Sequence, residues 1–578
     1  MVLPAALLLA ALAQEPSPPD RPSPNLPDAD LWRTERRLVD VHAHVEATEE
    51  RYARATRLLE GAGIGLALNL SGGTVTRRDG AASDFERHRE LAARLHPDRW
   101  MLAMNLDWSG YDEPDFAERA ARQIEEGARL GAAALKEYKR LGLTLRDRAG
   151  RLIPVDTRKL DLAWAKCAEL GLPVFIHVAD PKAFWLPRDE SNERWEELRN
   201  HPDWWFGDPA KHPPRDQLFE QLLRVVERHP ATTFVGVHFV DNPEELGKVD
   251  AWLERFPNLC ADVAARIPEI GRSDPDLVRP IFLRHADRIL LGTDFMVYDR
   301  LILGSGGDGP PPGDADADEF FARHWRFFET RDRGFAHMTP IQGRWTIDAI
   351  GLPADALRRI YFDNARRVLA RAWPAPRLRA RRVDRAIVLN GTLGDTEWTA
   401  APATTLDQES ESGRVRPEAA TVVRALWDDQ NLVLGFQCPF RRLTTLPGPD
   451  PTKERMGLWE GDVVELFVGR DAARPGRYFE FELAPDGQRL DVAVDLPRKD
   501  FGWDSGFRGF VFVDLERRVW SAELAIPFAA IGGAPARGEV WRANLFRCDR
   551  DLGASLALRP TLAATFHRPE RFAELVFE

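Results

Sequence analysis

Eight short apolar runs, separated by stretches with helical periodicity, occupy the first two thirds of this 578-residue sequence. The runs are Leu38–His42, Gly65–Leu70, Trp100–Asn105, Ala133–Tyr138, Pro173–His177, Thr233–His238, Leu259–Val263 and Arg288–Asp294. Strands that alternate with helices favour a parallel sheet covered by helices. We therefore predict an α/β fold, a (β/α)₈ TIM-type barrel, over residues 32–372, completed by a helix at Ala356–Ala372.

The last third of the chain has a different pattern. Beyond residues 373–382, which we interpret as a linker, short runs with period-two alternation replace the helical stretches. Examples are Thr421–Asp429, Asn431–Cys438, Asp462–Val468, Tyr478–Leu483, Val519–Ile526 and Val540–Arg547. Evenly spaced alternating strands are typical of an antiparallel β-sandwich, which we predict for residues 383–578.

The N-terminus carries a short apolar run, Leu3–Ala13, that ends in a small-x-small pattern. A transmembrane helix needs about 20 residues, so we interpret residues 1–13 as a signal peptide and the Pro-rich residues 14–31 as a tether. We expect export, to the periplasm or the exterior. No later run is long and apolar enough to span a membrane. The formal net charge of −12 argues against nucleic acid as a partner.

The first strand ends in the sequence DVHAHV. Alternate side chains of a strand share one face, so His42 and His44 point in the same direction. His177 and His238 end the fifth and sixth runs, and Asp294 ends the eighth. In a (β/α)₈ barrel the carboxyl ends of all strands face one mouth, so these five side chains would converge. Four imidazoles and a carboxylate fit Zn²⁺ or a similar divalent ion.

The ordered motifs DVHAHV, ALKEYK, VFIHVADP, VGVHF and ILLGTDF resemble those of the amidohydrolase superfamily, specifically its amidohydrolase-related branch. The resemblance covers Leu38 to about Ala372 and implies a metal-dependent distorted barrel. On that pattern His42 and His44 hold the metal with His177 and Asp294. His238 would position or protonate the substrate, or complete a second metal site.

The resemblance also bears on the number of metal ions. Binuclear members carry a carboxylated lysine at the end of the fourth strand, where this chain offers Lys136 or Lys139. Other members of the branch keep one metal and leave the lysine free, so one or two ions are expected. We favour Lys136 as a site residue and Zn²⁺ as the ion, with Mn²⁺ as the alternative.

A divalent ion lowers the pKa of bound water to about 7, which makes it a nucleophile at neutral pH. With Asp294 as proton acceptor, we predict hydrolysis of an ester, lactone or amide carbonyl in a small, carbohydrate-derived substrate. Two alternatives remain open at this stage. The same scaffold supports a metal-dependent non-oxidative decarboxylase, and a degenerate barrel would leave a non-catalytic glycan-binding protein.

Substrate contacts are expected from the long segment between the fifth and sixth strands. Lys182, Arg188 and Arg194 lie in it and are candidates to receive a carboxylate or sugar acid. Arg266, just past the seventh strand, is a comparable anion clamp.

Residues 383–578 resemble family 9 carbohydrate-binding modules through LNGTLGDTEW, LWDDQNLVLGF, LWEGDVVELFV, WSAELAIPF and GEVWRANLFR. The resemblance implies a glycan partner, with aromatic faces stacked on sugar rings. Trp459 with Glu465 matches the aromatic-plus-acid placement of such modules, and Trp503 is the candidate opposing wall.

Overall fold

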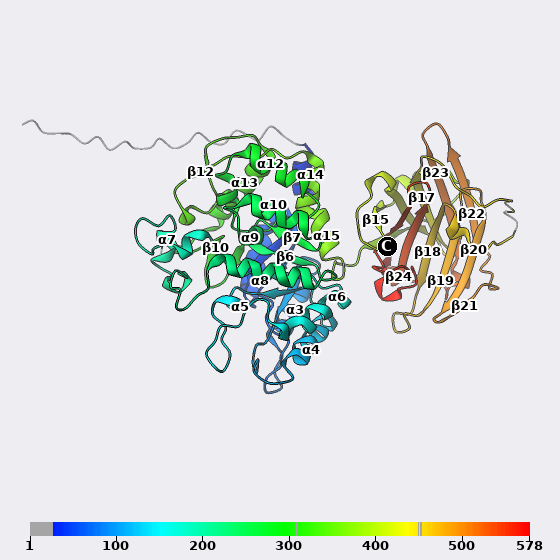
Figure 1. Cartoon of the computed structure of the whole chain (residues 1–578). Coiled ribbons are helices and arrows are strands. Elements are labelled where there is room, and N and C mark those ends of the chain that lie inside the picture. Colours follow the sequence, from blue (N-terminus) through cyan, green and yellow to red (C-terminus); the bar gives the residue numbers. More distant parts are fainter. Residues whose placement is uncertain (1–26, 308, 386, 449, 451–452) are drawn as a thin grey trace, which may run out of the picture.

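The structure is a computed structural model that describes residues 27–307, 309–385, 387–448, 450 and 453–578. Two domains lie side by side, joined by one segment of chain (Figure 1). The predicted signal peptide lies outside the described residues. The predicted tether is wrong at its C-terminal end, because Pro27–Thr34 forms helix α1, with Ala29 and Trp32 buried in the core of the first domain.

The first domain is a (β/α)₈ barrel, as the alternation of runs predicts. Its sheet has the order β10-β9-β1-β2-β3-β4-β5-β6-β7-β8, and β1 to β8 are parallel neighbours. The strands are β1 Leu38–Val45, β2 Ile64–Asn69, β3 Trp100–Asn105, β4 Ala134–Glu137, β5 Val174–Ile176, β6 Phe234–Gly236, β7 Leu259–Asp262, β8 Ile289–Leu290, β9 Phe295–Val297 and β10 Leu301–Leu303.

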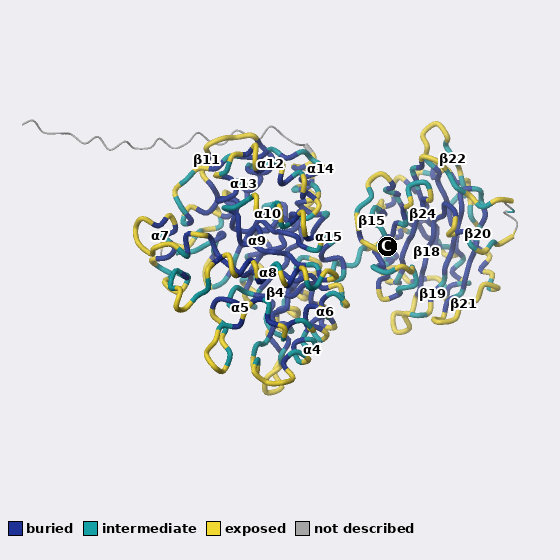
Figure 2. Tube along the Cα trace, viewed as in Figure 1, coloured by how far each residue is buried: buried dark blue, intermediate teal, exposed yellow. Residues whose placement is uncertain are grey.

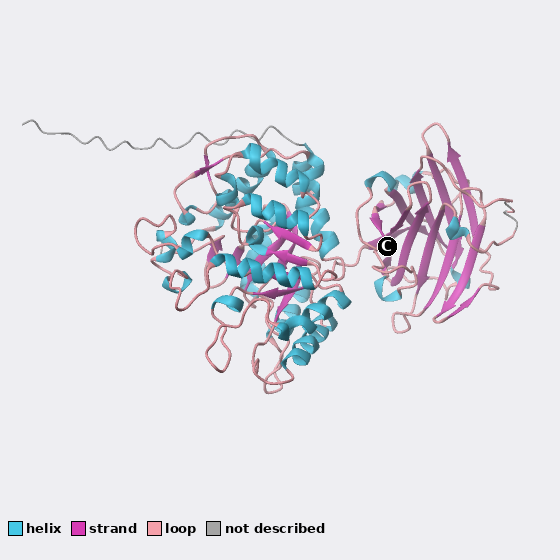
Figure 3. Cartoon of the chain, in the orientation of Figure 1, coloured by secondary structure: helices cyan, strands magenta, loops and turns pink. Residues whose placement is uncertain are grey.

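Helices surround these strands (Figure 3). The longer ones are α2 Glu49–Gly61, α3 Asp84–Leu95, α4 Phe116–Arg129, α6 Asp161–Leu170, α8 Arg215–Arg228, α10 Leu246–Arg255, α12 Pro275–Arg284 and α13 Asp314–Glu329. The predicted closing helix consists of α14 Ala354–Arg358, a π-helical turn at Arg359–Asp363 and α15 Asn364–Val368. Strands covered in this way are buried on both faces, and all eight residues of β1 are buried (Figure 2).

The barrel closes where the end of β8 meets β1. The backbone N–H of Val41 donates to Leu291 O at 3.0 Å, and that of Asp294 donates to His42 O at 2.8 Å. The buried carboxylate of Asp40 accepts from the backbone N–H groups of His42 and Thr293. This closure brings the first and last predicted metal ligands together, although 252 positions separate them in the sequence (294 − 42).

The second domain is an antiparallel β-sandwich with the strand order β21-β20-β19-β18-β24-β26-β13-β16-β17-β23-β22, with β14 beside β16 and β25 between β15 and β24. The strands are β13 Arg377–Arg382, β14 Thr404–Leu406, β15 Gln408–Glu409, β16 Thr421–Trp427, β17 Asn431–Pro439, β18 Val463–Gly469, β19 Arg477–Leu483, β20 Arg489–Asp495, β21 Arg498–Asp500, β22 Arg508–Asp514, β23 Val519–Pro527, β24 Val540–Asp549, β25 Ala554–Ala557 and β26 Ala573–Phe577. One strand departs from the antiparallel pattern, because β13 runs parallel to both β16 and β26.

Strand β13 also corrects the predicted linker. Residues 377–382 belong to the sheet, so the connection between the domains shortens to residues 373–376. Alternating basic and apolar residues in RLRARR look like a charged connector. In the structure, Leu378 and Ala380 face the sandwich core and are fully buried, and the arginines face outward.

Within the described part of the chain, no helix has both the length and the apolar character needed to cross a membrane.

Candidate metal centre and ligand cavities

His42, His44 and Asp294 form a compact group at the mouth of the barrel. The Nε2 atoms of both imidazoles lie 3.4 Å from Asp294 Oδ1. Their other ring nitrogens contact the surrounding protein: His42 Nδ1 lies 2.9 Å from Asp262 Oδ2, and His44 Nδ1 lies 2.6 Å from Ser71 Oγ. Contacts of this kind fix the ring orientation and leave the Nε2 atoms turned toward the shared carboxylate.

His177 and His238 lie beside this group. The ring of His238 sits between two others, 4.7 Å from the His42 centroid and 4.6 Å from that of His177. His177 Nε2 is 2.8 Å from Ala179 O and 3.5 Å from Asp241 Oδ1. The structure therefore brings all five predicted residues to one mouth, with His177 nearer to His238 and Asp241 than to the His42–His44–Asp294 group.

The backbone after β6 is strained. His238, Phe239, Val240 and Asp241 have φ values of 56°, 58°, 55° and 53°, and Asp294 has φ 60°. Runs of left-handed residues other than glycine are costly and concentrate at functional sites. This run begins just after β6. It places the imidazole of His238 and the carboxylate of Asp241 in the same group of candidate metal ligands.

The protonation states of His44, His177 and Asp294 suit a bound cation. Burial alone would raise the pKa of Asp294, but hydrogen bonding from His44 and nearby positive charge lower it to about 2. Burial lowers the pKa of His44, and it lowers that of His177 to about 3. Neutral imidazoles and an ionised carboxylate are the forms in which these side chains ligate metal ions.

Two orphaned polar atoms support the same interpretation. Lys136 Nζ and Asp241 Oδ1 are buried and have no hydrogen-bond partner within the described structure. Burial lowers the pKa of Lys136 to about 8, and the nearby carboxylates keep it from falling further. Ligand atoms of His42, His44 and Asp294 lie within 4.8 Å of one another, as do those of His177, His238 and Asp241. The donor set therefore fits one or two divalent cations.

A cavity of about 540 Å³ opens above these residues. Its wall contains aromatic and cationic side chains, among them Tyr138, Lys139, Arg140, Phe184, Trp204, Phe206, Arg266, Tyr298 and Arg300. Arg266 is buried, and its Nε has no hydrogen-bond partner among the described residues. Lys139 Nζ lies 2.5 Å from Asp180 Oδ2. The cavity thus combines aromatic and cationic side chains in its wall.

Three predicted substrate contacts do not line this cavity. Lys182 and Arg188 are exposed and do not line the cavity. Arg194 is buried, where it pairs with Glu197 and Glu269 and stabilises the long segment after β5. Positive charge in the sequence did not indicate whether a side chain faces the cavity or the interior of its own loop. Of the four predicted residues, Arg266 lines the cavity.

The long segment still contributes to the cavity, through Asp180, Phe184, Trp204 and Phe206. Sequence reasoning missed the carboxylates Asp180 and Asp241, although a signal was present. Each follows a strand-end histidine by three positions, in HVAD and HFVD. Asp262 is the last residue of β7, and its Oδ2 holds His42 Nδ1.

The sandwich has its own cavity, of about 350 Å³, lined by Trp459, Glu465, Phe467, Glu480, Lys499, Phe501, Cys548, Arg550, Ser555, Ala564, Thr565, Phe566 and His567. Trp459 and Glu465 thus share one cavity. Trp503 lies elsewhere and is wrong as its opposing wall, because its ring stacks on Phe479 at 4.8 Å and packs against the main core. Phe501, two positions earlier, lines the cavity in its place.

Three buried carboxylates, Glu465, Glu480 and Glu482, lie on this face of strands β18 and β19. Burial raises the pKa of each, and that of Glu480 reaches about 7. Both carboxylate oxygens of Glu482 lack a hydrogen-bond partner within the described structure. These acids favour the protonated form, which can donate a hydrogen bond as well as accept one.

Comparison with known proteins identifies the family of the first domain. Residues 39–371 match the family described as Amidohydrolase. A curated "Extracellular protein" of Arthroderma benhamiae is 24% identical over 184 residues, which cover 28% of this chain and 80% of that protein.

Two solved structures are similar to separate parts of the chain. The 4-oxalomesaconate hydratase of Rhodopseudomonas palustris aligns with a TM-score of 0.34 and 15% identity, over 58% of this chain and 96% of that chain. A family 9 carbohydrate-binding module of Caldicellulosiruptor kristjanssonii in complex with cellotriose aligns with a TM-score of 0.27 and 13% identity, over 35% and 94%.

Proposed function

The chain belongs to the amidohydrolase family, and we propose that it is an exported, metal-dependent hydrolase of a small, carbohydrate-derived ester, lactone or amide. The observation that carries the proposal is the position of His42 Nε2 and His44 Nε2, both 3.4 Å from one oxygen of an ionised Asp294. Burying each of these polar side chains costs free energy of folding. The group is therefore better explained as a binding site for a cation than as a contribution to the stability of the fold.

His42, His44 and Asp294 would hold the cation together with His177. We propose Zn²⁺, with Mn²⁺ as the alternative, because imidazole and carboxylate donors suit both. When bound, the ion supplies Lewis acidity that makes water a nucleophile near neutral pH. Lys136 stands in the same group with an unpartnered amine, and its carboxylation would provide for a second ion.

Asp294 is the proposed proton carrier. Its low pKa keeps it ionised at neutral pH, so it can accept a proton from the attacking water and return it to the leaving group. His238 is the proposed positioning residue for the substrate. Its Nδ1 donates to Ala264 O at 2.8 Å, so in the neutral ring Nε2 carries the lone pair and can accept a hydrogen bond from the substrate or ligate a second cation. Burial keeps the pKa of His238 well below its ordinary value, which favours this neutral form.

The cavity wall favours a substrate with one anionic group. The unpartnered Nε of Arg266 and the charges of Arg140 and Arg300 would bind a carboxylate, and Trp204 and Phe206 would pack against the rest of the molecule. The sandwich would hold a glycan at Trp459 and Glu465. A glycan bound there would keep the barrel near a carbohydrate-derived substrate.

The same carboxylate-binding wall favours a second candidate, non-oxidative decarboxylation. The two functions differ in their products. The test is metal analysis of the purified protein, followed by a screen of lactones, esters, amides and aromatic acids with detection of released carbon dioxide. A new acid without carbon dioxide supports hydrolysis, and carbon dioxide release supports decarboxylation. Protein that binds no divalent cation when offered Zn²⁺ or Mn²⁺ would refute both.

A further inference from the structure

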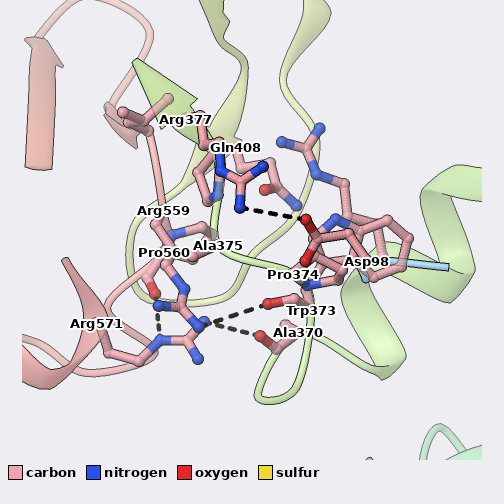
Figure 4. Close-up of a pocket in the computed structure, with 13 residues that line it drawn as sticks. Asp98, Ala370, Trp373, Pro374, Ala375, Arg377, Gln408, Arg559, Pro560 and Arg571 are labelled. Carbon is pink, nitrogen blue, oxygen red and sulfur yellow. Dashed lines mark hydrogen bonds and ion pairs between the residues drawn. The ribbon is translucent and has the colours of Figure 1, made fainter. Parts of the chain in front are cut away.

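A third cavity, of about 300 Å³, lies at the junction of the two domains (Figure 4). Asp98 and Arg366 enter it from the barrel, Trp373 from the connection, and Arg559 and Arg571 from the sandwich. Arg377, the first residue of β13, also lines it. The cavity is therefore a shared feature of both domains, remote in sequence from the barrel histidines and from Trp459.

The cavity gathers four guanidinium groups and one carboxylate, that of Asp98. Arg366 pairs with Asp407 at 3.1 Å, and Arg377 pairs with Glu574 at 2.7 Å and with Asp98 at 3.5 Å. These partners neutralise the charges of Arg366 and Arg377.

The other two arginines have no carboxylate partner among the described residues. Arg571 is buried and donates to backbone oxygens of Pro560, Arg371 and Ala370 at 2.6–3.0 Å. Arg559 reaches Phe572 O at 3.3 Å and Trp373 O at 3.5 Å, and its Nε is buried without any partner. Carbonyl oxygens satisfy hydrogen bonds but leave the positive charges in place.

Further arginines lie near Arg559 and Arg571 and add positive charge around the cavity. Burial, together with the charges of Arg559 and Arg371, lowers the pKa of Arg571 to about 9. Burial also lowers the pKa of Arg559, with the charge of Arg542 adding to the effect. The charges of Glu570 and Glu574 offset part of this effect at Arg571 and Arg559, respectively. Positive charge that is weakly screened away from bulk water favours the binding of an anion.

We propose that the junction cavity binds a small oxyanion of phosphate or sulfate type, with Arg559 as its principal hydrogen-bond donor and Arg571 as a source of positive charge. Arginine is suited to this task because its planar fork matches the oxygens of such anions. Since the cavity is lined from both domains, a bound oxyanion would tie the sandwich to the barrel across residues 373–376. This inference does not depend on the proposed hydrolase activity.

The test is calorimetric titration of the full chain with inorganic phosphate and with sulfate, using chloride at matched ionic strength as the control. We expect saturable binding that Arg559→Met weakens about tenfold, the loss expected for one charge-assisted hydrogen bond. Arg424→Met is the matched variant, because Arg424 also lacks a carboxylate partner within the described part of the chain and lies outside the cavity. Arg266→Met removes a cation from the barrel cavity and must leave junction binding unchanged.

A second measurement does not depend on the variant. We expect saturating phosphate to slow tryptic cleavage after Arg371 and Arg377, at the connection, about fivefold or more, an effect that chloride does not reproduce. Repeating the titration with glucose 6-phosphate distinguishes a free ion from the same group on a sugar. Equal affinity of the unaltered protein and Arg559→Met, or equal protection by chloride, would overturn the proposal.

Discussion

Each domain buries a cluster of ionisable side chains beside a cavity, and the two clusters differ in charge balance. In the barrel, Asp294 lies among imidazoles and beside Lys136, and its pKa is about 2. In the sandwich, Glu465, Glu480 and Glu482 lie mainly among one another, and the pKa of Glu480 is about 7. Burial is nearly complete in both places. The neighbours therefore decide whether a buried carboxyl group is an anion or an acid.

This difference in charge suits two kinds of ligand. An anionic carboxylate flanked by neutral imidazoles is a donor set for a cation. A group of protonated acids can donate and accept hydrogen bonds, which suits the hydroxyl groups of a neutral sugar. On the proposed functions, the barrel carries out the chemistry and the sandwich binds the glycan, so substitutions in each cluster should have separable effects.

Asp294→Asn should have the largest effect. The amide keeps the shape of the side chain but removes the charge and the proton acceptor, so kcat/KM for any substrate found in the screen should fall about 10³-fold or more. The measurement is steady-state kinetics together with circular dichroism, since the fold should be retained. Asp203→Asn, an exposed carboxylate lining the same cavity, is the control and should change kcat/KM little. Unchanged turnover in Asp294→Asn would contradict its proposed role.

His44→Ala should affect metal content most directly. Removing one imidazole from the four proposed donors should weaken binding of Zn²⁺ or Mn²⁺ about 100-fold, and chelation of the unaltered protein should abolish activity in a manner that added metal reverses. The measurement is metal per chain after dialysis against graded chelator. His201→Ala is the control, because His201 lines the same cavity but stacks on Trp204 at 3.9 Å. Equal metal content in both variants would show that His44 is not a metal ligand.

The strand pattern allowed much of this arrangement to be predicted from sequence. Trp100–Asn105 is a strand with the predicted bounds, and the histidines that end the fifth and sixth runs do meet those of β1. The prediction worked because parallel strands of a closed barrel end on one side, so the position of a residue at a strand end fixes its neighbourhood.

Predictions that depended on side-chain direction within loops failed. Arg194 and Trp503 have suitable chemistry, yet Arg194 pairs with Glu197 in its own loop and with Glu269 beyond β7, and Trp503 packs on Phe479. No periodicity constrains a loop, so composition there gives the type of interaction and not its partner. The predicted start of the sandwich at Val383 failed for another reason: β13, which begins at Arg377, is set by pairing with β26, nearly 200 residues later.

The acid cluster should respond to pH in the opposite sense to an ordinary ion pair. The folded-state pKa of Glu480, about 7, lies above the ordinary value of 4.5. Its contribution to stability is therefore complete below about pH 4.5 and lost as the pH rises through about 7. Glu480→Gln should raise the stability of the sandwich at pH 8 by on the order of 2–3 kcal/mol and leave it nearly unchanged at pH 4.

Urea unfolding of the sandwich transition at both pH values measures this change in the free energy of unfolding. The exposed Glu460 supplies the control, since Glu460→Gln should shift neither transition. A stabilisation of equal size at pH 4 and pH 8 would mean that packing, and not ionisation, separates Glu480 from glutamine. In that case the sandwich would give no support to the view that neighbouring charges set the protonation of a buried carboxyl group, and only Asp294 in the barrel would support it.

Trp459→Ala should have the smallest effect, and it tests the sandwich as a binding site. The indole is 37% exposed and lines the cavity that contains Glu465. Loss of one stacking ring should weaken binding of a cello-oligosaccharide or other glycan about tenfold, with hydrolysis of a small soluble substrate unchanged. Trp459→Phe should recover most of the affinity. Phe510→Ala removes an exposed aromatic ring outside the cavity and serves as the control. Equal loss of affinity in Trp459→Ala and Phe510→Ala would indicate that glycans bind any aromatic surface of this domain. Unchanged affinity in both variants would show that glycans do not bind through Trp459 in the sandwich cavity.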